Sequence, residues 1–489
     1  MTRRFRRVAI VSLIVLFTIA TRLPSLVVDR AIDDEAVYSL VANEIIDGGR
    51  PYVDAVERKP PLLFWTYAAV FKLAGKYNWR ALHVVSVIWT LATMLGLYLI
   101  GRQLFDRTTG CWAALLYCIY QPWGTWKNLA LNGELLMNLP IVWAWALAFQ
   151  RGVVGRRTRV IAAGALLCAG FLLKQPAAIA GLPLGLYLLG SGKRRPTWTG
   201  FIEALLFTMG FVAALGLVMI ILERQGILDE AIFWSIRQHA LRYIFWGHAS
   251  VITFAFVGAS LPLLFGGVKG WPLWSAIRAE RFAILGWLAV SVIGTAAGGR
   301  FYPHYYIQLV PPLALLAAPW FASVWVQDSR LRHRKFSRRS VLAVLGATVV
   351  VFFVLHWLGL KSKQPGAAAQ YLSEHSIEQD RIFVWGHSAS IYLDSHRRPA
   401  CRYILTFPLT GYLFGESVPN LDTTESIVPG SWDRLQEDFS KHPPVYIVDV
   451  ESDPDARYPI RDFPTLNSLI AQHYKLVSHG SDYNIYRRR

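Results

Sequence analysis

Long apolar runs recur along most of this sequence and constrain its fold more than any other feature. Of the 489 residues, 54% are hydrophobic, and the mean hydropathy is +0.34. A water-soluble chain of this length would be more polar and would not carry repeated apolar runs of about 20 residues. The runs predict an α-helical polytopic membrane protein with about 11 transmembrane helices, at residues 8–27, 82–100, 110–121, 135–150, 160–173, 176–190, 200–222, 249–268, 282–297, 306–326 and 340–358.

The N-terminus, M-T-R-R-F-R-R, precedes the first apolar run and resembles the start of a signal peptide. No small-residue cleavage site follows the run, so we interpret it as a retained signal anchor with a cytoplasmic N-terminus. The four cysteines do not suggest a disulfide framework, because three of them fall in apolar runs and Cys401 stands alone.

Basic residues concentrate in every second loop. Residues 1–7 and the loops 101–109, 151–159, 191–199, 269–281 and 327–339 contain 22 Lys and Arg residues and only three acidic residues. This asymmetry assigns these loops to the cytoplasm of a cell inner (plasma) membrane protein. The chain has a formal net charge of +18, which these loops explain. The basic charge is therefore a topology signal and requires no nucleic-acid partner.

The same topology gathers the remaining ionisable residues on the outer face of the membrane. The segments assigned there are 29–61, 122–134, the turn at Lys174, 223–248 and 298–305. Polar groups at the level of a membrane are energetically costly and usually mark a function. Their convergence on one side predicts a single site.

Beyond Leu360 the composition changes to that of a soluble α/β domain. We divide the chain into a transmembrane catalytic domain, 1–359, and an extracytoplasmic domain, 360–489. The predicted strands are 381–386, 445–450 and the closing segment 483–486, and the predicted helices are 366–375, 431–440 and 464–473. An odd number of spans places this domain outside.

The first outer loop contains the densest group of charges. Asp33, Asp34 and Glu35 precede an apolar pattern of helical spacing, which predicts an amphipathic helix over 34–46 that lies on the membrane. Asp33 is expected at its N-cap, with Asp34 and Glu35 in the first turn. Surface-helix capping alone would explain these acids equally well. The loop ends on Arg58 and Lys59, and a second interfacial helix is expected over 62–75.

Four further groups of polar residues fall on the outer face. Glu134 lies at the mouth of a span and could simply start a helix, and Lys174 lies in a tight turn, where a lysine can reach the interface without any function. The segment 298–312 carries Arg300, Tyr302, His304 and Tyr305; an aromatic belt would explain the tyrosines, but the two basic residues fit a clamp for a lipid phosphate better. His239, Arg242 and His248 lack the ordered spacing of metal ligands.

Carboxylates beside cations on an outer membrane surface suit the transfer of a group from a lipid phosphate to a hydroxyl. A carboxylate removes the proton of the hydroxyl. Lysine and arginine neutralise the departing phosphate, which arginine can bind through two hydrogen bonds. If the group is a sugar, a second carboxylate can stabilise the oxocarbenium-like state.

Five motifs resemble, in order, those of the GT-C glycosyltransferases: I-D-D-E-A-V-Y, R-K-P-P-L-L-F-W, L-N-G-E-L-L-M-N-L-P, G-F-L-L-K-Q-P-A and H-Y-Y-I-Q-L-V-P-P-L-A-L-L. The nearest resemblance is to bacterial lipid A aminoarabinose and galacturonosyl transferases, with protein O-mannosyltransferases more distant, over roughly residues 8–330. It implies a polyprenyl-phosphate-sugar donor and an inverting transfer on the outer face. The acceptor would be lipid A, a polysaccharide, a lipid-linked glycan or a protein.

The resemblance also implies roles for individual residues. Asp34 and Glu35 match the acidic pair of the family's first outer loop, with Asp34 as the expected base, and Glu134 matches the acid of the second outer loop. Lys59 matches the lysine that faces the donor phosphate, with Arg58, Arg300 and Lys174 as further phosphate-binding cations. Tyr302, His304 and Tyr305 are expected to bind substrate.

Arg58 departs from the family pattern. The aminoarabinose transferases have a glutamate immediately before the lysine, so a divalent metal is an open alternative and no cofactor is implied with certainty. A transporter or flippase for lipid-linked saccharides is the alternative function, but the sequence has no internal repeat and no midplane polar groups. A non-catalytic partner in an envelope complex is a third alternative, and neither the sugar nor the acceptor follows from the sequence.

Overall fold

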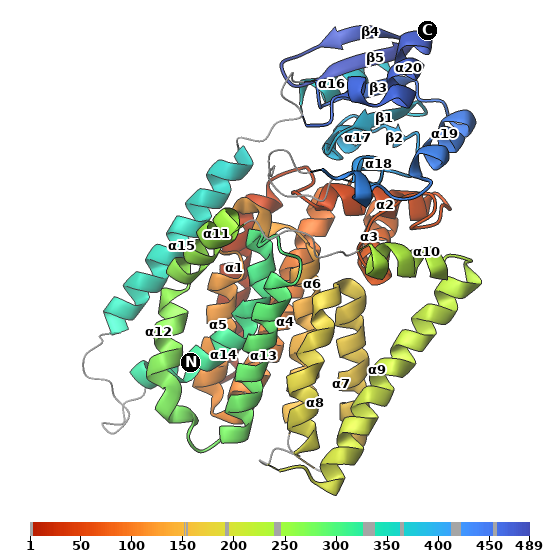
Figure 1. Cartoon of the computed structure of the whole chain (residues 1–489). Coiled ribbons are helices and arrows are strands. Elements are labelled where there is room, and N and C mark those ends of the chain that lie inside the picture. Colours follow the sequence, from red (N-terminus) through yellow and green to blue (C-terminus); the bar gives the residue numbers. More distant parts are fainter. Residues whose placement is uncertain are drawn as a thin grey trace.

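The computed structural model has a bundle of apolar helices with a five-stranded sheet at one end (Figure 1). It describes residues 3–489 except 151, 153–154, 191–194, 239–245, 326–337, 362–365, 412–421 and 453–456. His239 and Arg242 therefore lie outside the described residues. Below, the C-terminal unit denotes the described part of residues 366–489.

Helices occupy every stretch for which a span is predicted. They are α1 (Arg3–Leu26), α4 (Trp79–Leu104), α5 (Arg107–Tyr120), α6 (Gly133–Phe149), α7 (Arg156–Leu173), η2 (Gln175–Ala180) with α8 (Gly181–Leu189), α9 (Trp198–Arg224), α11 (Trp246–Ala259) with α12 (Leu261–Gly270), α13 (Arg278–Ala296), η5 (Pro303–Leu309) with α14 (Val310–Trp325), and α15 (Arg338–Lys361). Within the described residues, five helices are long and apolar enough to cross a membrane, or six if the bent pair α11 and α12 forms one span. The helical class is confirmed, whereas the number of eleven spans is not.

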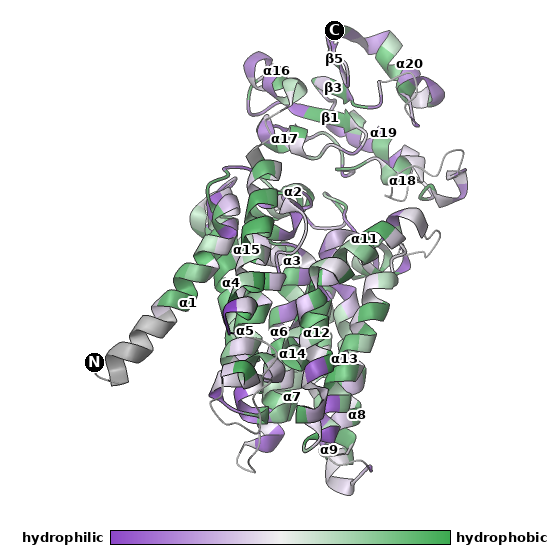
Figure 2. Cartoon of the chain, turned by 90° about the vertical axis from the view of Figure 1, so that its left-hand side faces the viewer, coloured by the Kyte–Doolittle hydropathy of each residue, from purple (hydrophilic) through white to green (hydrophobic). Residues whose placement is uncertain are grey.

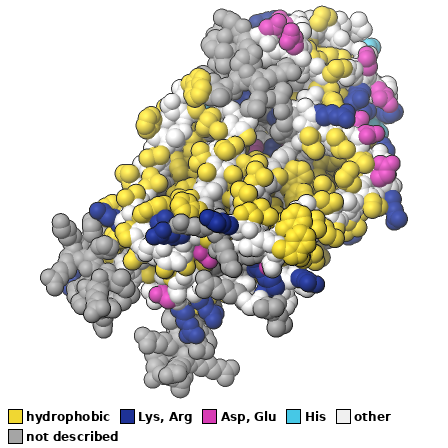
Figure 3. All heavy atoms as spheres, turned by 60° about the horizontal axis from the view of Figure 1, so that its bottom comes forward, with side chains coloured by type: hydrophobic (Ala, Val, Ile, Leu, Met, Phe, Trp, Pro, Cys, Tyr) yellow, Lys and Arg dark blue, Asp and Glu magenta, His cyan; other side chains and the backbone are white. Residues whose placement is uncertain are grey.

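The bundle keeps an apolar exterior. Helices α9 and α15 leave most of their apolar side chains exposed, including Phe201, Val212, Leu217 and Val350, while α14 is buried along its length. Figure 2 shows hydrophobic residues along the helices and hydrophilic ones toward the ends of the bundle. Figure 3, in which the end away from the sheet comes forward, shows Lys and Arg side chains grouped beside a broad apolar surface. This distribution suits an apolar solvent around the helices and water at their ends.

The first outer loop contains two helices, α2 (Glu35–Ile46) and α3 (Pro61–Ala74). The second agrees with the predicted 62–75. The expected N-cap is wrong: Asp34 stands at the N-cap of α2 without a side-chain capping bond, and Asp33 precedes it with a φ of 55°. Helix α2 also has most of its residues buried against α3 and the C-terminal unit, so it is an internal element and not one that lies flat on a membrane.

The C-terminal unit contains a sheet in the order β2-β1-β3-β5-β4. Strands β1 (Arg381–Trp385), β2 (Arg398–Pro399) and β3 (Tyr446–Asp449) are parallel, and β5 (Asn484–Arg488) pairs antiparallel with β3 and with β4 (Tyr474–His479). The helices are α16 (Ala367–His375), α17 (Ser390–Asp394), α18 (Phe407–Thr410), α19 (Ser431–Lys441) and α20 (Pro464–His473). The predicted strands and helices are present, whereas β2, β4, α17 and α18 were not predicted.

Smaller elements complete the described chain. They are η1 (Trp126–Leu129), α10 (Leu228–Ile232), the π-helical turn η3 (Phe233–Arg237), η4 (Trp271–Trp274), η6 (Thr424–Ser426) and η7 (Ile460–Asp462).

The C-terminal unit rests on the first outer loop. Arg398 contacts Glu44 and Asp47 on α2 at 3.5 and 2.9 Å. His396 stacks on Tyr77, with the ring centroids 4.5 Å apart. A backbone bridge joins Val56 to Tyr403. These contacts fix the sheet above the loop that contains the predicted site.

Candidate active site

Asp34 lies among cations that come from three separate segments. Its Oδ2 accepts a 2.9 Å hydrogen bond from the Tyr38 hydroxyl, one helical turn along α2. Burial alone would raise its pKa, but electrostatic interactions with Lys59, His304 and Lys174 and the bond from Tyr38 hold the pKa of Asp34 below its ordinary value. The side chain is only half-buried. Asp34 is therefore an ionised carboxylate within reach of a ligand.

Asp33 differs from its neighbour. Its carboxylate binds Lys127 at 2.7 Å. Burial and the charge of Asp34 raise its pKa, while Lys127 and His304 act in the opposite direction. A positive φ is uncommon outside glycine but several-fold enriched in aspartate, so the sequence tolerates the left-handed turn here. After this turn the Asp33 carboxylate contacts Lys127, whereas the Asp34 carboxylate interacts electrostatically with Lys59.

Lys174 and Glu134 form a buried ion pair at the start of α6 and the end of α7. Gly133 allows the approach, because a Cβ at this position would lie 2.9 Å from Cδ of Lys174. Burial lowers the pKa of Lys174, and the charge of Lys59 lowers it further, whereas Glu134 and Asp34 raise it. The ammonium group also lies 4.5 Å from the centroid of the Tyr305 ring.

Lys59 completes the charged group. Its carbonyl accepts a 2.8 Å hydrogen bond from the Tyr52 hydroxyl, and Nζ lies 3.4 Å from Oε1 of Glu57. Nζ also lies 5.8 Å from the centroid of the Tyr38 ring. An ammonium has three donors, so one long contact to Glu57 leaves capacity for another anion. The backbone is fixed while the charged end remains half-buried.

The aromatic residues of the segment before α14 form a connected cluster. Tyr302 stacks on His304 with centroids 5.8 Å apart, and both rings make edge contacts with Tyr305, at 5.6 and 4.8 Å. Tyr305 lies beside Lys174 as described, so this cluster forms one wall of the charged group. Arg300 precedes the cluster in the same segment and is half-buried.

Glu35 occupies a different environment from the one expected. Its carboxylate is fully buried and accepts hydrogen bonds from the backbone amides of Ile32 and Leu131 at 2.8 and 2.7 Å. Nε2 of His83 lies 3.2 Å from Oε2. These partners occupy both oxygens, so Glu35 joins the first outer loop to α4 and to the start of α6.

The network around Glu35 continues into the bundle through Arg22. This buried arginine on α1 donates to Oε1 of Gln121 at 2.6 Å and to the carbonyl of Leu129 at 3.2 Å, and lies close enough to Glu35 to interact with its charge. Sequence analysis missed the network. The available signal was an arginine inside the first predicted apolar run and a histidine at the start of the second.

A divalent metal is the open alternative for the site beside Lys59. A divalent cation needs several oxygen or nitrogen ligands. Among the residues that the structure describes, no three His, Cys, Asp or Glu side chains converge as metal ligands. Arg58 adds a positive charge directly beside Lys59. No step below uses a metal.

Comparisons with known proteins give one family match and several similar structures. Residues 58–221 match the model of the dolichyl-phosphate-mannose-protein mannosyltransferase family. The chain is similar in structure to ArnT from Cupriavidus metallidurans in the apo state, with a TM-score of 0.64, 16% sequence identity and 98% of each chain covered. A second ArnT structure, bound to undecaprenyl phosphate, gives a TM-score of 0.60, 15% identity and the same coverage.

The oligosaccharyltransferase AglB from Archaeoglobus fulgidus, in complex with an inhibitory peptide and a dolichol-phosphate, is also similar. Its TM-score is 0.56 and its sequence identity 11%, with 100% of this chain and 74% of that chain covered. No curated protein sequence matches the chain. The resemblance to GT-C-type glycosyltransferases is confirmed by the family match and by the shared fold.

Proposed function

We propose that this chain, with the fold of ArnT and AglB, transfers a sugar from a polyprenyl-phosphate-linked donor to a hydroxyl of an envelope acceptor. The observation that carries the proposal is Asp34, an ionised, half-buried carboxylate among Lys59, Lys174 and His304. A base beside cations is the arrangement that lipid-phosphate-linked transfer requires. The neighbour structures with bound undecaprenyl phosphate and dolichol-phosphate support a donor of this class.

Asp34 acts as the general base in this proposal. The acceptor oxygen forms a bond to the anomeric carbon of the sugar while the bond from that carbon to the phosphate oxygen breaks. The hydroxyl proton passes to Asp34, and the electron pair of the broken bond stays on the phosphate. A carboxylate with a lowered pKa is fully ionised at neutral pH, so it accepts the proton as the attacking oxygen loses electron density. A single displacement of this kind inverts the anomeric centre.

The cations neutralise the phosphate that leaves. The charges of Lys59 and Lys174 both act on Asp34, and Arg58 and Arg300 add further positive charge from the segments 29–61 and 298–305. Glu134 holds Lys174 by their buried ion pair and therefore acts through that lysine. Because Glu35 is enclosed by backbone amides, we assign it a structural role and not a catalytic one.

The wall of Tyr302, His304 and Tyr305 suits a sugar. Aromatic rings provide flat apolar faces, and the tyrosine hydroxyls and the imidazole provide hydrogen-bonding groups. We propose that this wall binds the sugar or the acceptor beside Asp34, Lys59 and Lys174.

We also propose that the site lies on the outer face of the inner membrane, with residues 366–489 outside and the N-terminus in the cytoplasm. The described parts of the basic loops between α4 and α5, between α8 and α9 and between α12 and α13 lie at the end of the bundle away from the sheet, which supports this orientation (Figure 1). A reporter fused after Gly359 is expected to report an extracytoplasmic position. A cytoplasmic signal from that fusion would contradict the orientation and the location of the site.

The function itself is tested by mass spectrometry of envelope glycolipids, glycans and glycoproteins from cells with and without the gene. One glycoconjugate is expected to lose a single sugar in the deletion strain, and its polyprenyl-phosphate donor should accumulate. An unchanged set of glycoconjugates would contradict the proposal. A transporter would instead move the donor across vesicles of the purified protein without cleaving its sugar–phosphate bond.

A further inference from the structure

The side chain of Phe407 brings the C-terminal unit into contact with the charged group. Its ring lies over the Arg58 guanidinium, with Cζ 4.7 Å from the ring centroid. Phe407 is 3% exposed and begins the short helix α18. Arg58 immediately precedes Lys59 in the chain. A residue of the sheet-bearing unit therefore contacts a cation proposed to bind the donor phosphate.

Phe407 is itself held between the two halves of the molecule. Its ring makes an edge contact with Trp234 of η3, with centroids 6.1 Å apart. Within the C-terminal unit, Nε1 of Trp432 donates to the carbonyl of Leu409 at 3.2 Å, and the amide of Val428 donates to the carbonyl of Pro408 at 2.9 Å. These bonds fix α18, so the ring of Phe407 has a defined position.

The backbone that carries Arg58 is fixed from both sides. Nε2 of Gln175 donates to the carbonyl of Arg58 at 3.1 Å and to that of Ser235 at 2.8 Å. Two residues earlier, the amide of Val56 donates to the carbonyl of Arg402 at 2.8 Å. An arginine side chain has several rotatable bonds, so holding it in one rotamer costs free energy on binding unless a neighbour already restricts it.

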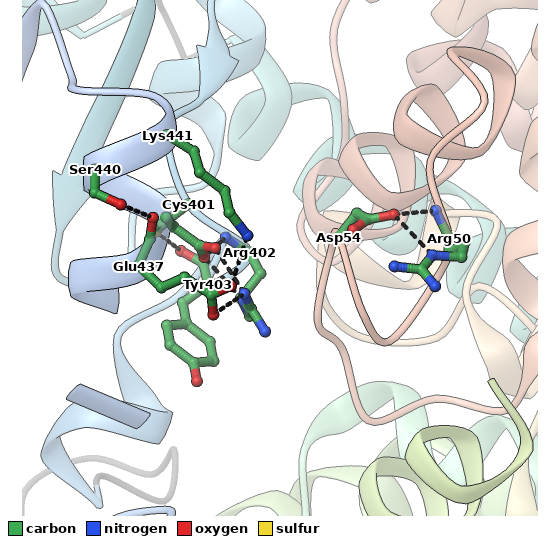
Figure 4. A network of polar contacts seen from close by, with 9 residues as sticks. Arg50, Asp54, Cys401, Arg402, Tyr403, Glu437, Ser440 and Lys441 are labelled. Atoms are coloured by element: carbon green, nitrogen blue, oxygen red, sulfur yellow. Dashed lines mark hydrogen bonds and ion pairs between the residues drawn. The ribbon is translucent and has the colours of Figure 1, made fainter. Parts of the chain in front are cut away.

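Arg402, whose carbonyl accepts the hydrogen bond from Val56, is itself held by an ion pair. The Arg402 guanidinium binds Asp438 of α19 through Nε at 2.9 Å and Nη2 at 2.7 Å, and the backbone amide of Arg402 donates to the same carboxylate at 2.9 Å. Figure 4 shows this network beside the part of the first outer loop that contains Arg50 and Asp54. The C-terminal unit thus presents both a fixed backbone edge and a fixed ring to the segment 56–59.

The surroundings of Arg58 also favour its charge. His387 follows the end of β1 and interacts electrostatically with Arg58. Burial and the charge of Arg58 together lower the pKa of His387 to about 4, so the imidazole is neutral at pH 7. It therefore adds no positive charge that would repel the guanidinium.

We propose that Phe407 is a positioning residue that orients the Arg58 guanidinium toward the donor phosphate, so that the C-terminal unit takes part in donor binding. A planar guanidinium stacks well on an aromatic face and keeps its N–H groups at the edge of the stack. That geometry leaves the edge directed at an anion and reduces the entropy lost on binding. The inference rests on the proposed function, because it assumes a phosphate beside Lys59.

The experiment measures binding of undecaprenyl phosphate to the full-length protein by native mass spectrometry. Phe407→Leu keeps the apolar volume but removes the ring, and is expected to weaken binding about three- to thirtyfold, the range of a partly desolvated cation–π contact. Phe407→Tyr keeps the ring and should bind like the wild type. Phe439→Leu is the matched control, since Phe439 packs on Phe383 inside the C-terminal unit, and it should not alter binding.

A double-mutant cycle isolates the role of Phe407 from its effect on folding. Arg58→Ala should weaken binding, and adding Phe407→Leu to that variant should cost nothing further. If Phe407→Leu costs as much in the Arg58→Ala background as in the wild type, Phe407 does not act through Arg58 and the inference fails. The inference also fails if Phe407→Leu alone binds undecaprenyl phosphate like the wild type.

Lys59→Ala separates failure of the inference from failure of the proposed function. If this variant binds undecaprenyl phosphate weakly while Phe407→Leu binds normally, only the inference is overturned. If Lys59→Ala, Arg58→Ala and Phe407→Leu all bind like the wild type, the phosphate site lies elsewhere and the proposed function loses its donor site as well.

Discussion

Replacing Asp34 by asparagine is expected to lower the turnover number about 10²–10⁴-fold while binding of the polyprenyl-phosphate donor stays largely intact. Asparagine has nearly the same shape and can still accept the bond from Tyr38, but it cannot take a proton at neutral pH. The variant also removes a half-buried negative charge from between lysines, so anion binding should not weaken. Turnover is measured as transferred sugar per folded enzyme, with the product identified by mass spectrometry.

Glu134→Gln is the matched control for this experiment. It should release Lys174 from its ion pair and alter donor binding more than the chemical step. If Asp34→Asn turns over normally while Glu134→Gln is inactive, the roles of the two acids are exchanged. If both variants keep normal turnover, neither carboxylate is the base and the proposed mechanism is wrong.

Replacing Glu35 by glutamine should have the opposite pattern: a large loss of stability, with the donor affinity of the folded fraction retained. Glutamine offers one oxygen where the backbone amides of Ile32 and Leu131 need two, so one buried N–H group loses its acceptor. That loss alone costs about 1–3 kcal/mol. The lost negative charge near buried Arg22 adds to it.

The stability of Glu35→Gln is measured from the thermal midpoint of the solubilised protein, beside Asp34→Asn as the neighbouring control. Glu35→Gln should unfold several degrees lower, whereas Asp34→Asn should unfold only slightly below the wild-type temperature, because the lowered pKa of Asp34 means that its half-buried charge is net stabilised in the folded protein. If Glu35→Gln has wild-type stability but no turnover, the structural assignment is wrong and Glu35 is a catalytic residue.

The membrane half could be predicted well because apolar length is a local property of the sequence. Every predicted span corresponds to a helix, and the group of Asp34, Lys59, Lys174 and Glu134 follows once the charged loops are assigned to one side. The strands β1 and β3 were also predictable, since they are short, continuous apolar runs. The number of helices that cross the membrane depends on tilt and packing, which the composition does not determine.

The distinction between Asp34 and Glu35 could not be predicted. Asp34 is the N-cap and Glu35 the first residue of α2, and adjacent side chains of a helix point about 100° apart. Asp34 therefore lies toward Lys59 and Lys174, whereas Glu35 is buried in the interior. The partners of Glu35 are backbone amides, which every residue possesses, so no side-chain pattern marks them.

The role of the C-terminal unit was equally hidden. Phe407 lies outside the predicted helices and strands, and a single phenylalanine in a loop has no signature. Its contact with Arg58 joins residues far apart in the sequence. Such long-range pairings depend on how the two halves dock and can be found only in the folded structure.

The buried Arg22 has a consequence for how the protein is made. Its hydrogen-bond partners Gln121 and Leu129 are synthesised about 100 residues later, and Glu35 gains its bond from Leu131 only then. Arg22 lies near the C-terminal end of α1, where insertion costs less than the roughly 2.5–3.5 kcal/mol of an arginine at the centre of a span. The first helix is therefore synthesised before Ser86 of α4, Gln121 after α5 and Leu129 can accept hydrogen bonds from its guanidinium group. The guanidinium group of that helix therefore needs other hydrogen-bond acceptors until the chain has been extended past the third hydrophobic segment.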